Sequence, residues 1–243
     1  MALNVITAKR IYEKLINNGL THEGACGLVG NLWAESGLSS TNLENQYEKK
    51  LGMDDHSYTA AVDNGEYTNF VKDSAGYGLA QWTYWSRKER LLIFAKSRGQ
   101  SIGNEDMQTT FLISELQTKY RGIYDVLCSS HSIDECARLV MTKFENPANQ
   151  SEQAQLGRVS LANQVATAIR GTNVKPVVAY GARGENVAEM QRALIQHGYS
   201  CGPKGADGIY GMATKEALGA YQTDHNLTVD YMCGPKTWAS LLS

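Results

Sequence analysis

A helical spacing of apolar residues recurs along most of the first 170 residues and constrains the fold more than any other feature. Within residues 21–36, four apolar residues stand at positions i, i+3, i+4 and i+7 and so share one helix face: Ala25, Leu28, Val29 and Leu32. Thr21 is suited to cap this helix and Gly37 to end it. Similar patterns predict helices over residues 8–18, 54–61, 87–99, 107–120, 132–145 and 151–169, with Thr7 as the cap of the first. The fold class is therefore predicted to be mainly α.

The helical spacing weakens between residues 40 and 80, where Asp, Asn, Gly and Tyr accumulate in turn-rich pieces such as DNGEYTNF and KDSAGYG. We expect an irregular loop there, followed by a short β-hairpin near residues 68–80. Such a hairpin would give the first domain an α+β character. Residues 171–180 contain few helix formers and one proline, so they are predicted to be a linker between a domain at 1–170 and another at 181–243.

The C-terminal third contains an internal repeat with the spacing D-x-x-x-G-x-x-T. Its two copies are Asp207-Gly211-Thr214 and Asp230-Gly234-Thr237. Each glycine suits a tight turn, and each threonine can cap the helical pattern that follows. We therefore expect a small helical domain built from two related halves. Its predicted core residues are Val187, Met190, Leu194, Ala217, Leu218 and Tyr221.

Composition narrows the class of protein. Hydrophobic residues make up 42% of the chain, and 23 Lys and Arg residues against 25 Asp and Glu give a net charge of −2. This balance argues against a dedicated nucleic-acid binder, and no apolar run is long enough for membrane insertion. The N-terminus becomes charged too early for a signal peptide, so we expect a cytoplasmic protein. The five cysteines form no C-x-x-C pair and predict no metal site; a Cys201–Cys233 bridge is compatible with the spacing.

Glu35 is the charged residue that the helical pattern explains least. It lies about 20° from Leu28 around the helix and one turn from Leu32, on the apolar side. An apolar environment disfavours the charged form of a carboxyl and raises its pKa, which suits a general acid. A glutamate paired to an arginine or lysine, or one that reaches solvent at the helix end, would serve structure instead.

Residues 73–82, DSAGYGLAQW, combine groups that suit a sugar ring. Tyr77 and Trp82 offer flat apolar faces, Gln81 supplies an amide, and Asp73 precedes them on the loop. Sugars present apolar C–H faces and polar edges, so aromatic planes beside amides can bind them.

Together these stretches resemble the phage tail lysozymes of the lysozyme superfamily. The similarity covers roughly residues 5–170 and rests on Gly30-Asn31 with Glu35-Ser36, on the run GYGLAQWT from Gly76, and on Arg87. It implies a lysozyme-like domain with two lobes, Glu35 as proton donor and peptidoglycan as substrate. Ser36, Tyr77, Gln81 and Trp82 are then expected to contact the substrate.

A second catalytic carboxylate is expected in the turn-rich region. Asp73 lies closest to the glycine-rich run and is the predicted residue, with Asp63 as the next choice and Asp54 and Asp55 in the same loop. Glu145, in the run FENP, is predicted to fix a structural corner.

Residues 181–243 resemble the three-helix peptidoglycan-binding domain of many wall hydrolases. The similarity rests on these groups: Gly184, Val187, Met190-Gln191 and Leu194; Gly198-Tyr199; Asp207-Gly208, Tyr210-Gly211 and Thr214; Tyr221-Gln222; and Gly234-Pro235 with Thr237-Trp238. It implies wall binding through Asp207, Tyr210 and Trp238. Tyr231 departs from the pattern, since the second copy usually has glycine after Asp. Some relatives act as spacers rather than as wall binders, and this is the alternative role for residues 181–243.

The two resemblances predict a modular endolysin that cleaves the glycan strand, as an N-acetylmuramidase without a cofactor or metal. Lytic transglycosylase action and a non-catalytic wall-binding or virion structural role are the alternatives. An amidase or a cysteine peptidase is disfavoured because the five histidines are scattered and Cys26 has no obvious partner. We expect the protein to reach the wall after membrane permeabilisation, with release through a holin-like protein.

Overall fold

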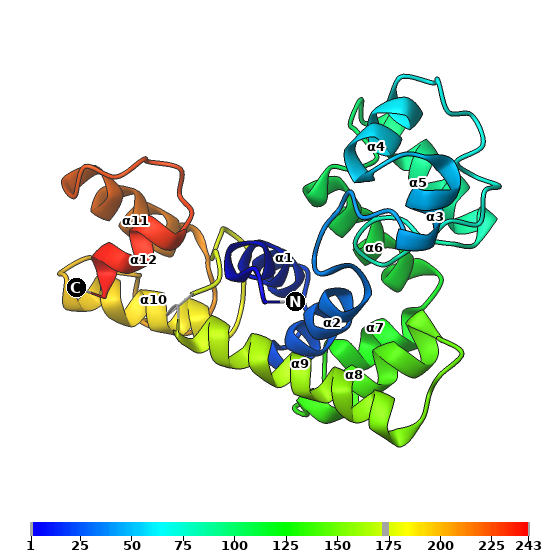
Figure 1. The fold of residues 1–243 in the computed structure, drawn as a ribbon. Coiled ribbons are helices and arrows are strands. Elements are labelled where there is room, and N and C mark those ends of the chain that lie inside the picture. Colours follow the sequence, from blue (N-terminus) through cyan, green and yellow to red (C-terminus); the bar gives the residue numbers. More distant parts are fainter. Residues whose placement is uncertain (1, 172–174, 243) are drawn as a thin grey trace. The chain divides into compact units, whose positions relative to one another are not determined.

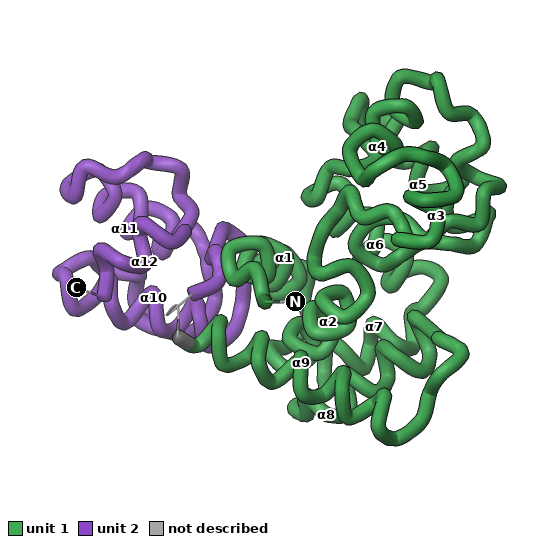
Figure 2. Tube along the Cα trace, in the orientation of Figure 1, with its two compact units in different colours: residues 1–171 green, residues 172–243 purple. Residues whose placement is uncertain are grey.

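The structure is a computed structural model that describes residues 2–171 and 175–242. The chain divides into two compact units, Met1–Gly171 and Thr172–Ser243 (Figure 2). Unit 1 contains these helices: α1 (Val5–Asn17), α2 (His22–Ser36), α3 (Asn45–Leu51), α4 (Asp55–Asp63), α5 (Trp85–Ser97), α6 (Glu105–Thr118), α7 (Arg121–Leu127), α8 (Ile133–Leu139), a π-helical segment η1 (Val140–Glu145) and α9 (Glu152–Gly171). Unit 2 contains α10 (Glu185–Gln196), α11 (Met212–Asp224) and α12 (Pro235–Leu241). The predicted mainly α fold is confirmed.

Helix α2 is enclosed by the helices that follow it in unit 1. It packs most extensively on α8 and α9, while α3 to α6 gather in another part of the unit (Figure 1). Three glycines on α2 allow its neighbours to approach closely: Gly24 faces α7, Gly27 faces α8 and Gly30 faces α9. A Cβ atom at Gly30 would lie 2.6 Å from the Ala162 backbone of α9. Glycine is thus required at this position by the approach of a neighbouring helix.

The ends of α2 form as its sequence predicts. The Thr21 side chain accepts a hydrogen bond from the Gly24 amide, and Gly37 ends the helix at a φ of 66°. Helix α1 begins earlier than expected, because Asn4 is its cap and accepts a hydrogen bond from the Thr7 amide. Thr7 therefore lies inside the helix, and its prediction as the cap is wrong.

The predicted hairpin at residues 68–80 is wrong. Among the described residues of this segment the chain forms turns, and its one ladder contact is an isolated antiparallel bridge between Tyr77 and Leu43. Ser74, Gly78 and Gln81 adopt left-handed backbone conformations, with φ of 63°, 72° and 43°. These residues coil the chain, whereas a strand needs extended φ values.

Unit 2 encloses its own hydrophobic core around α10, α11 and α12. All six predicted core residues belong to it: Val187, Met190, Leu194, Ala217, Leu218 and Tyr221. Cys201 and Cys233 are buried and free, so they form no disulfide bridge. In the described part of the chain, no helix has the length and apolar character that a membrane span requires.

A buried glutamine side chain makes equivalent hydrogen bonds in the two copies of the repeat. Gln191 of α10 donates to Asp207 Oδ1 at 3.1 Å and to Thr214 Oγ1 at 2.9 Å. Gln222 of α11 likewise donates to Asp230 Oδ1 at 2.8 Å. Each buried amide therefore holds one loop against the helix that precedes it. In the second copy Tyr231 adopts a left-handed conformation, with a φ of 59°. The equivalent residue of the first copy is Gly208, with a φ of 73°.

Candidate active site

Glu35 lies in the last turn of α2 and forms an ion pair with Arg158 of α9. The two side chains are 21% and 14% exposed. Arg158 Nη2 donates to Glu35 Oε1, and its Nη1 donates to the Asn31 carbonyl at 3.3 Å. The guanidinium and the carboxyl thus form a charge-assisted pair that joins α2 to α9. The site thus has the paired environment that sequence reasoning kept as the alternative to an apolar pocket.

Glu145 is a second carboxyl in electrostatic reach of Glu35. It ends the π-helical segment η1, and Asn146 then reverses the chain at a φ of 50°. Glu145 Oε1 is inaccessible to solvent and has no hydrogen-bond partner. Burial raises the pKa of Glu145 to about 8, and the negative charge of Glu35 is the next largest cause.

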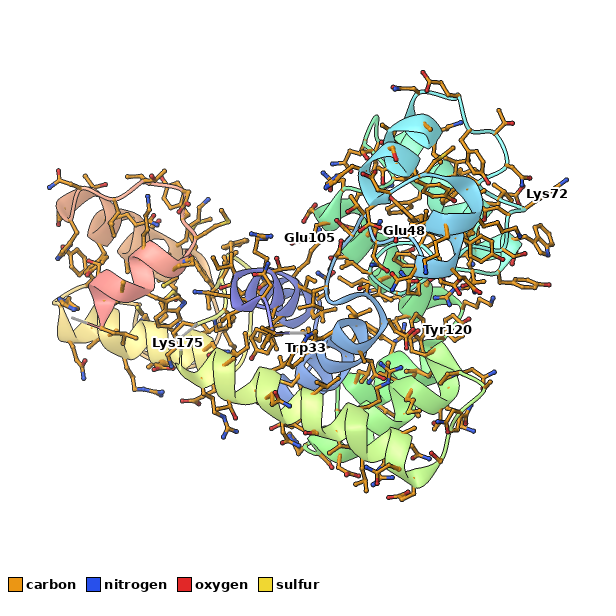
Figure 3. The ribbon with its side chains drawn as sticks, viewed as in Figure 1. Trp33, Glu48, Lys72, Glu105, Tyr120 and Lys175 are labelled. Atoms are coloured by element: carbon orange, nitrogen blue, oxygen red, sulfur yellow. The ribbon has the colours of Figure 1, made fainter. Side chains whose placement is uncertain are left out.

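The cations nearest to Glu145 are engaged with other carboxylates. Arg87 donates from Nε to Glu115 Oε1 at 3.1 Å and from Nη2 to Oε2 at 2.9 Å. Its guanidinium also lies over the Phe144 ring, 4.8 Å from the centroid, and 5.8 Å from the ring centroid of Tyr120, which is labelled in Figure 3. Arg158 is paired with Glu35 in the same way. The charges of Arg87 and Arg158 lower the pKa of Glu145, but burial and Glu35 outweigh them.

Asp73, the predicted second catalytic carboxylate, is buried elsewhere in unit 1. Its side chain is 3% exposed and pairs with Lys88, whose side chain is 0% exposed. The Tyr58 and Tyr67 hydroxyls donate to Asp73 Oδ2 at 2.5 and 3.2 Å, and the Ala75 amide donates to Oδ1 at 2.9 Å. Both carboxylate oxygens therefore accept hydrogen bonds from within the protein. These contacts place Asp73 in the interior of unit 1 as the ion-pair partner of Lys88.

The other aspartates considered also have structural contacts. Asp54 caps α4 by accepting a hydrogen bond from the Ser57 amide. Asp55 accepts from the Leu43 amide at 2.7 Å, and Asp63 accepts from the Ile102 amide at 2.9 Å.

The four predicted substrate contacts lie in one region but are satisfied internally. Ser36 Oγ donates to the Leu79 carbonyl at 2.9 Å, which joins the end of α2 to the glycine-rich run. Gln81 Nε2 donates to Asn42 Oδ1 at 2.7 Å. The first contact joins a loop to a helix, and the second joins two loops of the unit.

The two aromatic residues of that run are core residues. Tyr77 is 0% exposed, and its hydroxyl lies 2.6 Å from Thr59 Oγ1. Trp82 is also 0% exposed and donates from Nε1 to Glu115 Oε2 at 2.8 Å. The predicted sugar-facing rings are therefore turned inward. Their polar tips find partners inside the protein, as buried Tyr and Trp usually do.

Of the three predicted wall-binding residues, one is exposed. Asp207 lies at the surface and accepts a hydrogen bond from the Ile209 amide at 2.9 Å. Tyr210 and Trp238 are 1% and 2% exposed and belong to the core of unit 2. Trp238 Nε1 donates to the Pro176 carbonyl at 2.7 Å. These aromatic rings stabilise the domain and present little surface to a ligand.

Sequence reasoning missed Arg158, assigned Glu145 to a structural corner, and did not pair Arg87 with Glu115. One signal was available for Glu145: an acidic residue at the end of an apolar helical pattern, immediately before a turn, as at Glu35. Among the residues that the structure describes, no group of three or more His, Cys, Asp or Glu side chains could hold a metal ion.

Comparison with family models agrees with both sequence resemblances. Residues 6–169 match the model described as phage tail lysozyme, and they contain both Glu35 and Glu145. Residues 183–241 match the model described as a putative peptidoglycan binding domain, which falls within unit 2. Because the first match spans well over half of the 243 residues, the chain belongs to the phage tail lysozyme family of peptidoglycan-active enzymes.

Proposed function

We propose that unit 1 cleaves the glycan strand of peptidoglycan as an N-acetylmuramidase, with Glu35 as a catalytic carboxylate. The observation that carries this proposal is the position of Glu35 inside the matched region: it ends the central helix α2 and keeps 21% of its side chain exposed. Asp73 and the aromatic rings of the glycine-rich run are not accessible in this way.

Glycoside cleavage needs two things from the protein: a proton for the leaving oxygen and a negative charge beside the sugar as it becomes cationic. Glu35 is the proposed source of the proton, and its ion pair with Arg158 holds the carboxyl in place. It can donate the proton only when it is itself protonated. We assign Glu35 to the catalytic machinery on this basis.

Unit 2 is proposed to hold the enzyme on the wall. A second binding module raises the effective concentration of the first at the same polymer. We further propose that the protein meets its substrate after the membrane has been opened, for example by a holin-like partner.

The test is digestion of purified peptidoglycan by the wild type and by Glu35→Gln, with mass spectrometry of the released fragments. The wild type should release glycan fragments with reducing N-acetylmuramic acid ends. Fragments lighter by one water would identify a lytic transglycosylase instead. Glu35→Gln should lower the turnover rate at least about 10²-fold while it still sediments with walls.

Glu23→Gln is the matched control, because Glu23 lies on the same helix at its first turn. It should digest walls at the wild-type rate. A folded Glu35→Gln protein that clears walls nearly normally would exclude the proposed role of Glu35.

A further inference from the structure

We propose that a surface pocket at the start of α5 is a glycan-binding subsite, in which the rings of Tyr84 and Trp85 stack on a sugar and Lys72 pairs with a carboxylate that the glycan strand carries. The inference rests on the proposed glycan cleavage and names part of the surface that holds the substrate.

The pocket has a volume of about 640 Å³ and is lined by residues from two segments. Lys72 and Ser74 precede the glycine-rich run, and Thr83, Tyr84 and Trp85 follow it. All five residues are exposed. The volume lies within the usual range for ligand sites in proteins. The pocket therefore offers accessible surface that is large enough for a sugar unit.

The aromatic rings at this pocket face solvent, in contrast to those of the glycine-rich run. Tyr84 and Trp85 are 62% and 51% exposed, and their ring centroids lie 5.9 Å apart with an interplanar angle of 43°. Among the described residues, the Trp85 indole N–H has no hydrogen-bond partner, whereas the buried Trp82 donates to Glu115. Two adjacent exposed rings with free polar tips can stack on the C–H face of a sugar and bind its hydroxyls.

Lys72 gives the pocket its charge. It is the one charged residue of the lining and is labelled in Figure 3. In the part of the chain that the structure describes, no carboxylate pairs with its ammonium group. An unpaired lysine beside aromatic surface favours a ligand that has both an apolar face and an anionic group. Peptidoglycan has this chemistry, because the peptide stems on its N-acetylmuramic acid units carry carboxylates.

A buried ion pair joins the two walls of the pocket. Asp73 lies between Lys72 and Ser74 in the sequence and pairs with Lys88 of α5. The Lys88 amide in turn donates to the Tyr84 carbonyl at 3.1 Å. Ser74 has a φ of 63°, a conformation that persists in a serine only where the surrounding structure stabilises it. The backbone segments that carry Lys72 and Tyr84 are thus fixed before a ligand binds, which lowers the entropic cost of binding.

The pocket is built on segments that also contact the surroundings of Glu35. In the first turn of α5, Arg87 acts electrostatically on Glu145, and so does Glu35. Ser36 donates to the Leu79 carbonyl of the run that connects the two walls. A strand bound at the pocket is therefore held by segments that adjoin the candidate active site, as a subsite away from the cleaved bond requires.

Trp85 is itself a reporter of this pocket. The other three tryptophans, Trp33, Trp82 and Trp238, are 7%, 0% and 2% exposed, so acrylamide should quench mainly the fluorescence of Trp85. Acrylamide is uncharged, and Lys72 therefore does not attract it.

The first experiment measures this quenching in full-length Glu35→Gln, which should leave the ligand undigested. Its two probes are soluble, uncrosslinked peptidoglycan chains that keep their peptide stems and chitin oligosaccharides, which are uncharged. Saturating peptidoglycan chains should lower the Stern–Volmer constant at least about twofold, because a bound sugar covers the indole. Chitin oligosaccharides should also protect Trp85, but only at higher concentration.

The second experiment separates the ring from the charge. Trp85→Ala should raise KM for soluble peptidoglycan chains at least about fivefold and leave kcat near the wild-type value. Ile93→Ala is the matched control, because Ile93 is 61% exposed on the same helix. Lys72→Ala should weaken binding of the peptidoglycan chains about two- to fivefold and leave binding of chitin oligosaccharides unchanged. Lys49→Ala, at an exposed lysine of α3, should have no effect on either probe.

Three results would overturn the inference. The first is unchanged quenching of Trp85 at chain concentrations that saturate cleavage by the wild type, or a wild-type KM in Trp85→Ala. The second is equal affinity of the wild type and Lys72→Ala for the peptidoglycan chains, which would exclude the lysine as the anion partner. The third is protection of Trp85 that grows with protein concentration in the absence of glycan, since the occupant would then be a second copy of the chain.

The proposed function and this inference fail in separable ways. A wild-type protein that releases no glycan fragments would remove the proposed function, whereas protection of Trp85 by peptidoglycan chains would still establish the subsite. A wild type that cleaves, together with a Trp85→Ala protein of normal KM, would remove only the subsite.

Discussion

Lys88 and Asp73 form an ion pair inside unit 1, with Nζ 2.5 Å from Oδ1 and side chains that are 0% and 3% exposed. Burial lowers the pKa of Lys88, and the hydrogen bond and charge of Asp73 oppose that effect. Lys88 Nζ also donates to the Ala75 carbonyl at 2.8 Å. The pair therefore fixes the loop that leads into the glycine-rich run.

Asp73→Asn should destabilise the protein because it leaves the Lys88 charge buried without its partner. Removing one member of a buried pair typically costs about 3–5 kcal/mol in the free energy of unfolding. Chemical denaturation measures this loss, and the rate per folded molecule should stay near the wild-type value. The double variant Asp73→Leu/Lys88→Met should recover much of the stability. A stable Asp73→Asn protein without activity would restore Asp73 as a catalytic candidate.

Gly30→Ala should destabilise the protein although alanine favours helices. The new Cβ would meet the Ala162 backbone at 2.6 Å, and overpacking of this kind typically costs about 1–3 kcal/mol. Gly157→Ala is the matched control, because Gly157 lies on α9 with no atom within 4 Å of the position of its Cβ. That change should raise the thermal midpoint through helix propensity alone. Equal midpoints for the two variants would contradict the packing argument.

Glu145 should make stability depend on pH. Its pKa is about 8 in the folded protein against a usual 4.5, so between these values the folded chain keeps a proton that the unfolded chain has released. The Glu145 contribution to stability is therefore complete below about pH 4.5 and is lost as pH rises through about 8. Glu145→Gln has no such loss.

The measurement is urea unfolding of the wild type and Glu145→Gln between pH 5 and about 9. The free energy of unfolding of the variant, minus that of the wild type, should increase with pH and then level off above the pKa of Glu145. A difference that stays constant across this range would show that Glu145 has an ordinary pKa.

Residues 1–170 alone should fold and retain hydrolysis, since unit 1 is compact by itself. They should clear intact walls more slowly than the full chain at low concentration, because the tether supplied by unit 2 is lost. Clearing assays over a range of enzyme concentrations, with soluble glycan fragments as the control substrate, measure the effect. Equal clearing by both proteins at low concentration would exclude a targeting role for unit 2.

Local patterns in the sequence predicted most of the helices of unit 1, because capping and apolar periodicity act over a few residues. The two seven-residue helices α3 and α7 were not predicted. Thr21 and Gly37 bound α2 as expected. The error at residues 68–80 had a physical cause: Ser74 and Gln81 take left-handed conformations that tertiary contacts impose and that their residue types rarely adopt. Propensity could not reveal this.

The candidate site was predictable only in part. Position on the helix singled out Glu35, but no local pattern could pair it with Arg158, which lies 123 positions further along the chain. Aromatic residues near a predicted acid suggested a sugar site, yet Tyr77 and Trp82 are used by the core. Residue type indicates what a side chain can bind, and only packing determines whether it faces a ligand.

The pairing of Glu35 with Arg158 also has a consequence for synthesis of the protein. The carboxylate is made early, whereas its guanidinium partner belongs to the last helix of unit 1. A nascent or prematurely terminated chain that stops before α9 lacks this partner and the surface on which Gly30 packs. Such a fragment would hold Glu35 without its ion-pair partner and α2 without the helix against which Gly30 packs.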